Sequence, residues 1–391
     1  MTNKRTRREI LRNGLALAGL GVFGVPEWAL PALAQGETLV PFTDLNANTN
    51  FGTNGERRTF DIRKIDGPFT PKDQFFTTQH YGHPQIDMAA YRLKVTGLVD
   101  RPKSLSLDEL KTMRSTELVA GFECSGNRRP TQGLSGNGRW TGIPLKTLLD
   151  SAGVKAAARE FVFFGADHGE EEVEFRTQKY KLEQNFGRAL NREQAISVPG
   201  PFLAWAMNGE PLTKFQGSPL RLIVPGWYGV ANVKWLSHIH IQDDAFMGKF
   251  QTRWYRTVKG EMIDGQMVWN ETAVTHMQLK SFIARVTKNG DQHKVLGVVL
   301  NDGTPIKSVE VKVDEGPWQP ATMDRSTDDK VFKYGWKLFT YTWNGATPGE
   351  HTLVSRVTDN TGKVQPTEKD LENKKSFLED NSQHPRKVMI S

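Results

Sequence analysis

A single thiol stands in a stretch of residues whose chemistry suits a soft metal. Cys124 is the only cysteine of the 391-residue chain, so an intramolecular disulfide is excluded. It ends an apolar run and enters a polar turn at Gly126, a residue that readily adopts a positive φ. Arg128 and Arg129 follow, and nearby cations favour the ionised form of a thiol. The stretch favours a metal-ligating thiolate, and a buried structural cysteine is the alternative.

The first 34 residues have the pattern of an export signal. The twin arginines Arg7 and Arg8 precede an apolar, glycine-rich stretch over residues 14–25, and residues 32–34 form a small-residue cleavage site. We expect cleavage before Gln35 and twin-arginine export to the periplasm, a route used by proteins that fold around a cofactor first. The apolar stretch is short for a membrane span, and no later segment is long and apolar enough for one.

The charge of the chain argues against nucleic acid as a partner. The formal net charge is +7, and the signal contributes +3 of it, from five Lys and Arg residues against two Glu residues. Subtraction leaves +4 on residues 35–391. No dense block of basic residues is present. A mildly basic chain of this kind suits small anionic substrates or an acidic partner.

The pattern of residues 35–276 predicts an α+β domain built on a mixed sheet. Residues 161–164, 201–207 and 220–224 are short apolar runs typical of buried strands, with a turn expected over 165–169. Two short helices are indicated, one over 106–113 with a capping box and one between Pro144 and Gly153. The polar, Asn-rich residues 36–71 should form an irregular arm on the surface.

The pattern changes near residue 277. Alternating apolar and polar residues over 295–300, 309–313, 336–343 and 351–359 are typical of short strands, and turn residues separate them. Such spacing predicts an immunoglobulin-like β-sandwich over residues 277–391.

Six short motifs, in order along the chain, resemble those of the sulfite oxidase family of molybdopterin enzymes. The family's Cys-(Ala/Ser)-Gly-Asn-Arg-Arg matches residues 124–129, and its Val-Lys-Trp-Leu matches residues 233–236. Asn-Gly-Glu at 208–210, Pro-Leu-Arg at 219–221, Val-Pro-Gly at 224–226, and Asp359 before Val-Gln-Pro at 364–366 complete the series. The resemblance covers nearly all of residues 35–391 and implies a molybdopterin-binding catalytic domain (35–276) followed by a dimerisation domain (277–391).

The resemblance implies a role for each matching residue. Cys124 would be the one protein ligand of molybdenum, and Tyr255, Cys124 and His80 would act in catalysis. The residues that would bind the pterin and its phosphate are Phe76, Thr77, Thr78, Gln79, His80, Arg129, Asp167, Gln216, Arg221, Asn232, Val233 and Lys234. The cofactor would be molybdenum-molybdopterin. Haem is not expected, because the lone cysteine cannot make the two-cysteine attachment motif.

The chain departs from the animal and plant members at positions that contact the substrate. Thr78 stands where they carry an arginine that helps to hold sulfite, and Gln216 stands where they place a histidine near the phosphate. A second substrate arginine aligns nearest to Lys337. Losing guanidinium groups weakens fork-like binding of oxyanions.

These features predict a periplasmic, homodimeric sulfite dehydrogenase that passes electrons to an external cytochrome c-type acceptor. One alternative keeps the fold and cofactor but acts on another sulfur compound, as a sulfane dehydrogenase or a reductase. A second alternative is an exported binding protein without catalytic activity. Individual residues have plainer alternatives too: Tyr255 as a core aromatic and Asp167 as a turn residue. His238 and His240 lie two apart on one strand face and could form a metal pair, but no third ligand is apparent, so the sequence predicts surface residues.

Overall fold

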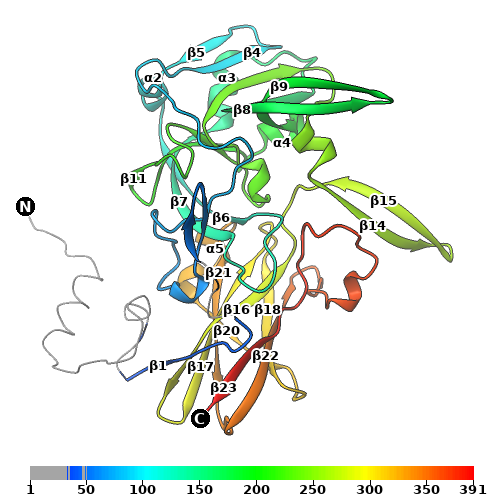
Figure 1. Cartoon of the computed structure of the whole chain (residues 1–391). Coiled ribbons are helices and arrows are strands. Elements are labelled where there is room, and N and C mark those ends of the chain that lie inside the picture. The colour runs from blue at the N-terminus through cyan, green and yellow to red at the C-terminus, as the bar shows by residue number, and fades with distance from the viewer. Residues whose placement is uncertain (1–32, 34–35, 46–48, 50) are drawn as a thin grey trace, which may run out of the picture.

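The computed structural model describes residues 33, 36–45, 49 and 51–391 (Figure 1). The expected export signal over residues 1–34 lies outside the described residues, except for Leu33. The described chain is mostly β-structure with few and short helices, as the strand patterns predicted. None of the described helices is long and apolar enough to span a membrane.

A mixed sheet of five strands forms one layer of the N-terminal part. Its strands are β4 (Leu93–Gly97), β5 (Lys103–Leu105), β8 (Glu160–Phe175), β9 (Gln178–Asn191) and β13 (Leu236–Gln242). The spatial order is β5-β4-β13-β8-β9. Strand β13 runs parallel to β4 and antiparallel to β8, which makes the sheet mixed. The buried faces of these strands share one apolar core with the sheet described next.

The second sheet carries the cysteine turn. Its strands are β6 (Thr116–Glu123), β7 (Ser135–Pro144), β10 (Phe202–Met207), β11 (Glu210–Pro211) and β12 (Arg221–Ile223). They lie in the order β11-β10-β7-β6, with β12 paired to β10. Cys124 directly follows β6, so the antiparallel pairing of β6 with β7 fixes where the turn begins.

The helices are short, and their ends follow the sequence signals. They are α2 (Leu107–Lys111), α3 (Leu145–Ala152), α4 (Arg192–Ile196), α5 (Asp329–Phe332), the 3₁₀ helices η2 (Ile62–Lys64), η3 (Gly229–Ala231), η5 (Arg325–Thr327) and η6 (Lys369–Leu371), and the π-helix η4 (Lys249–Arg253). The capping box of Ser106 and Glu109 is present at α2. Helix α3 follows Pro144 and ends at Gly153, whose φ of 71° suits a residue without a Cβ.

The C-terminal part consists of two antiparallel sheets (Figure 1, yellow to red). One has the order β1-β16-β17-β21-β20 and the other β19-β18-β22-β23. The bounds are β1 (Thr38–Val40), β16 (Lys280–Asn289), β17 (Gln292–Leu300), β18 (Ile306–Val313), β19 (Gln319–Pro320), β20 (Thr322–Met323), β21 (Lys337–Trp343), β22 (Gly349–Asp359) and β23 (Arg386–Ile390). The immunoglobulin-like assignment of this part stays a prediction.

Two hairpins lie beside these sheets. They are β2 (Gly52–Asn54) with β3 (Arg57–Thr59), and β14 (Arg256–Ile263) with β15 (Gln266–Ala273). The second hairpin projects from the body of the molecule (Figure 1). The first lies within the segment expected to be an irregular surface arm, so that expectation was wrong in part. Residues 57–59 pair with 52–54, and Arg58 also bridges to Thr77.

The turn expected over residues 165–169 is not a turn. Strand β8 continues through it to Phe175, and the pairing with β9 only shifts its register between Phe164 and His168. The irregularity persists because its backbone has other partners: Ala166 N–H donates to Trp235 O at 2.8 Å, and Asn185 Nδ2 donates to Gly165 O at 2.9 Å. Such bulges redirect a side chain within a strand.

Candidate active site

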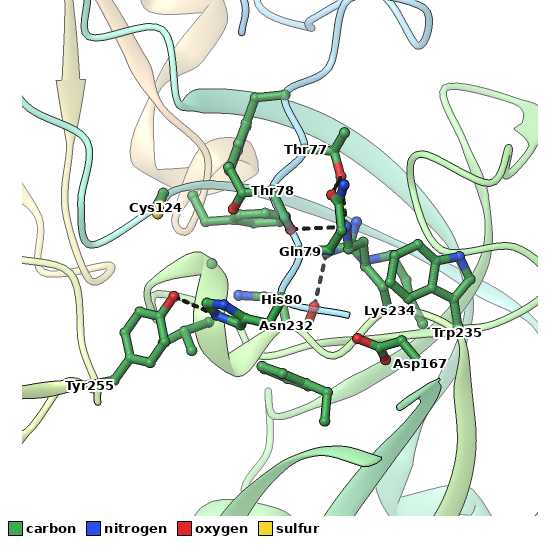
Figure 2. Close-up of a pocket in the computed structure, with 16 residues that line it drawn as sticks. Thr77, Thr78, Gln79, His80, Cys124, Asp167, Asn232, Lys234, Trp235 and Tyr255 are labelled. Carbon is green, nitrogen blue, oxygen red and sulfur yellow. Dashed lines mark hydrogen bonds between the residues drawn. The ribbon is translucent and has the colours of Figure 1, made fainter. Parts of the chain in front are cut away.

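A pocket opens where residues from both sheets of the N-terminal part converge (Figure 2). Its lining combines aromatic side chains with a few polar and charged groups, as small-molecule and cofactor sites do. Many of the residues assigned to the cofactor or to catalysis from the sequence line it. These are Phe76, Thr77, Thr78, Gln79, His80, Cys124, Asp167, Arg221, Asn232, Lys234 and Tyr255.

Cys124 is held at the pocket by its own backbone. Its N–H donates to Leu134 O, and its carbonyl accepts from Asn127 N–H, each at 2.8 Å, which closes the turn. Burial raises the pKa of the thiol, while hydrogen bonds from the Gly126 backbone and the Thr78 side chain, and the charge of Arg57, act in the opposite direction. These contacts would stabilise a thiolate, and a thiolate is the form that binds soft metals.

A buried ion pair anchors the turn to the C-terminal part. Lys280 of β16 donates to Glu123 Oε2 at 3.0 Å, and both side chains are only 1% exposed. Lys280 Nζ also donates to Asn127 O at 3.2 Å, and Asn127 Nδ2 donates to Glu123 Oε2 at 2.8 Å. The residues on both sides of Cys124 are therefore fixed by one network that reaches across 157 positions of sequence.

A buried histidine lies in the C-terminal segment that packs behind this turn. Burial, together with the charges of Arg386, Arg129 and Lys280, lowers the pKa of His384 to about 2. The folded protein thus keeps His384 neutral, whereas the unfolded chain takes up a proton below the ordinary pKa of about 6.5. The contribution of His384 to the free energy of unfolding is therefore fully present above the pKa of the unfolded chain, and it is lost as the pH falls below that pKa.

We expect His384→Gln to make the free energy of unfolding depend less on pH below pH 7. Between pH 7 and pH 5 the native protein should lose about 2 kcal/mol more unfolding free energy than the variant, because the unfolded His384 gains its proton in that window. Urea unfolding at both pH values measures the difference. The other histidines are the same in both proteins, so parallel profiles would contradict the assignment.

The inner wall of the pocket is cationic. Arg221 is 3% exposed and donates only to carbonyls, to Gln216 O at 2.9 Å and Asn232 O at 3.1 Å, and its Nε has no partner. Lys234 donates to Thr77 Oγ1 at 2.6 Å and to Thr78 O at 3.0 Å. Burial lowers the pKa of Arg221 to about 9 and that of Lys234 to about 7. A bound anion would offset this cost of burial, so the wall is suited to phosphate.

Asp167 enters the pocket from the bulge of β8 (Figure 2). Its Oδ1 is buried without a hydrogen-bond partner. Burial raises the pKa of this carboxyl to about 6, and the charge of Lys234 opposes the rise. An orphaned acceptor of this kind is suited to a ligand that carries N–H donors.

His80 and Tyr255 meet at the pocket's outer side (Figure 2). His80 Nε2 and the Tyr255 hydroxyl are 2.9 Å apart. The His80 ring stacks on Phe250 of η4 with a centroid distance of 4.3 Å. Burial, with the charges of Lys249 and Lys234, lowers the pKa of His80 to about 4, and burial raises that of Tyr255. Both groups are thus neutral, and the tautomer of His80 decides which of the two donates in this hydrogen bond.

Four residues considered from the sequence lie elsewhere. Arg129 forms an ion pair with Glu368 at 2.8 Å, and Val233 packs in the core. Gln216 is 1% exposed, donates to Lys72 O at 2.8 Å and accepts Arg221 through its carbonyl, so it supports the wall from behind. The buried Lys337 Nζ donates to the carbonyls of Phe332 and Lys333 at the end of α5 and forms an ion pair with Asp329 at 3.1 Å. The Asn232 side chain, although in the lining, donates to Tyr228 O rather than into the pocket.

The histidine pair at 238 and 240 is not on the open surface. Both rings are half-buried and share Thr96 Oγ1, at 2.7 Å from His238 and 2.9 Å from His240. No group of three or more His, Cys, Asp or Glu residues in the described part of the chain could hold a metal ion.

The pocket also has residues that the motifs did not indicate. Phe122, Phe186 and Trp235 give it aromatic walls. Trp235 adopts a left-handed backbone conformation with φ of 51°, which is uncommon for a bulky residue and is a feature of functional sites. Phe186 reaches the pocket from β9 by hairpin pairing, which no local pattern reveals. Trp235 could have been found, since it follows Lys234 in the motif.

Comparison with known proteins identifies the family of this pocket. A family model described as an oxidoreductase molybdopterin binding domain matches residues 80–250. Sulfite oxidase of Arabidopsis thaliana is 25% identical over 361 residues, covering 83% of this chain and 88% of that protein. Mitochondrial sulfite oxidase of Homo sapiens is 28% identical over 328 residues, covering 76% of this chain and 57% of that protein.

Nitrate reductase [NADH] of Ulva prolifera is 31% identical over 218 residues, which is 52% of this chain and 24% of that enzyme. The chain thus spans a quarter to just over half of several curated relatives. Among solved structures, the sulfane dehydrogenase SoxCD from Paracoccus pantotrophus superposes with a TM-score of 0.71 at 25% identity, over 90% of this chain and 91% of that one. With a molybdopterin domain model on the pocket and sulfite oxidases matching most of its length, this chain belongs to the sulfite oxidase family of molybdopterin oxidoreductases.

Proposed function

We propose that the protein is a molybdenum-dependent sulfite dehydrogenase. Sulfite and water would become sulfate, two protons and two electrons, and the electrons would leave one at a time to an external cytochrome c-type acceptor. The observation that supports this best is the convergence of the Cys124 thiol, the Tyr255–His80 pair and the cations Arg221 and Lys234 on one pocket.

The residues fit molybdenum-molybdopterin on three counts. Cys124 offers one soft ligand, and the orphaned Asp167 Oδ1 offers an acceptor for the amino groups of a pterin. Arg221 and Lys234 are buried cations whose only described hydrogen-bond partners are neutral oxygens, and a phosphate would pair them. When bound, the cofactor would supply the two-electron redox chemistry.

The chain's own part is to position the substrate and hold a proton. The Tyr255 hydroxyl can donate its one proton to a substrate oxygen when the neutral His80 carries its proton on Nε2 and donates it to the phenol oxygen. The aromatic walls from Phe122, Phe186 and Trp235 limit water in the pocket. The cations favour entry of a dianion, so substrate capture should weaken as the salt concentration rises.

We further propose that the mature protein is periplasmic, that the haem of the electron acceptor belongs to another chain, and that two copies associate through residues 277–391. The twin-arginine pattern supports the first proposal and the single cysteine the second. Cell fractionation of tagged protein with intact and Lys-substituted Arg7 and Arg8 tests export. Light scattering of the purified protein tests the dimer.

A second candidate is oxidation of another sulfur compound, and one observation favours it. Thr78 lines the pocket where the animal and plant members carry a substrate arginine. One solved structure of similar fold is that of a sulfane dehydrogenase. A less oxidised sulfur donor would fit a pocket that has lost this guanidinium.

The test is acceptor reduction by purified protein of measured molybdenum content. We expect sulfite to drive the reduction of both ferricyanide and cytochrome c, in proportion to the metal bound. Metal-loaded protein that ignores sulfite but turns over thiosulfate or a persulfide would select the second candidate. Protein without molybdenum, made in a cofactor-competent host, would refute both.

A further inference from the structure

The hairpin β2–β3 lies directly against the segment that carries Thr78. Arg58 N–H donates to Thr77 O, and Thr77 N–H donates to Arg58 O, each at 3.0 Å. This antiparallel bridge places Arg57 opposite Thr78 in the next register position. Gln79 Nε2 donates to Glu56 O at 2.8 Å, which continues the same alignment by one more residue.

The register puts Arg57 on the same face of the paired strands as Thr78, which lines the pocket. Side chains directly opposite each other in an antiparallel pair share a face, and neighbouring residues alternate. Arg58 belongs to the other face, where its guanidinium lies 4.0 Å from the ring centroid of Phe215. Thr78 and Cys124 line the same pocket, and Arg57 is the direct cross-strand neighbour of Thr78.

The charge of Arg57 is available to a ligand. Its side chain is exposed, and it forms no ion pair with any described residue. The neighbouring Glu56 is paired instead with His83, at 3.2 Å from Nδ1.

We propose that Arg57 binds the anionic group of the sulfur substrate at the mouth of the pocket, supplying from the adjacent strand the guanidinium that position 78 lacks. The proposal rests on the proposed function, since it concerns the substrate of the same site. A guanidinium recognises an oxyanion through two parallel N–H groups.

The experiment compares Arg57→Gln with Arg57→Lys and with Arg114→Gln. Arg114 is exposed and lies outside the pocket lining. Arg114→Gln removes the same charge as Arg57→Gln, so it is the matched control. In Arg57→Gln we expect the KM for sulfite to rise about tenfold with kcat within about threefold of native, which corresponds to losing one charge-assisted hydrogen bond. The KM of Arg57→Lys should lie between those of the native protein and Arg57→Gln. The salt dependence of kcat/KM should weaken only in Arg57→Gln.

A binding measurement separates this proposal from the proposed function. Sulfate titrated into molybdenum-loaded protein should bind about tenfold more weakly to Arg57→Gln than to Arg114→Gln, whether or not sulfite is the true substrate. Absence of sulfite turnover in the native protein would refute the proposed function alone. Equal sulfate affinity and equal KM in the two glutamine variants, with equal molybdenum content, would overturn the role of Arg57.

Discussion

Replacing Cys124 with serine is expected to abolish sulfite-dependent turnover. We expect a fall of more than about 100-fold in kcat, because changes to residues that merely support a metal ligand already cost about 10- to 100-fold. A serine hydroxyl is a hard donor and stays protonated near neutral pH, so it cannot replace a soft thiolate. Bound molybdenum, measured by mass spectrometry of the purified protein, should fall as well.

The fold should survive this change. The turn at Cys124 is closed by backbone hydrogen bonds to Leu134 and from Asn127, and serine keeps both. The control is therefore native protein made without molybdate, which should melt at nearly the same temperature as Cys124→Ser. If the variant retained native molybdenum content and native kcat, Cys124 would not be the ligand, and it would be a structural cysteine after all.

Short-range signals were enough to predict several features of the fold. Helix α3 begins and ends where Pro144 and Gly153 indicate, because helix ends depend on neighbouring residues alone. The mixed sheet followed from apolar runs of strand length. The turn expected over 165–169 was wrong, because Gly165 and Asp167 look like turn residues locally, while the bulge depends on hydrogen bonds from Ala166 to Trp235 and from Asn185.

The site residues that could be predicted from the sequence are those that fall within the family's motifs. Cys124, Arg221 and Lys234 each fall within a motif, and the structure brings them to one pocket. Arg57 could not be found, because its place depends on pairing with Thr78, and strand register is invisible in one sequence. Lys280 is a further case, since its partner Glu123 is 157 positions away.

The largest expected loss of stability comes from breaking the buried pair of Glu123 and Lys280. Lys280→Met should lower the free energy of unfolding by about 3–5 kcal/mol, because it leaves an uncompensated carboxylate in the core. Urea unfolding measures this loss. The variant should also bind less molybdenum, since Asn127 loses the donor to its carbonyl and the turn is held less firmly.

The double variant Glu123→Gln with Lys280→Met separates charge from packing. A neutral glutamine can still accept from Asn127 Nδ2, so most of the lost stability should return, as it does when buried ion pairs are replaced as a unit. Molybdenum binding should recover less than stability, because Met cannot donate to Asn127 O and this contact is what links β16 to the turn.

Recovery of both to the native level would mean that Lys280 only balances the charge of Glu123. Recovery of neither would mean that the cost lies in the shape of the side chain. Partial recovery of molybdenum with full recovery of stability would assign Lys280 the positioning of Cys124 from the C-terminal part of the chain.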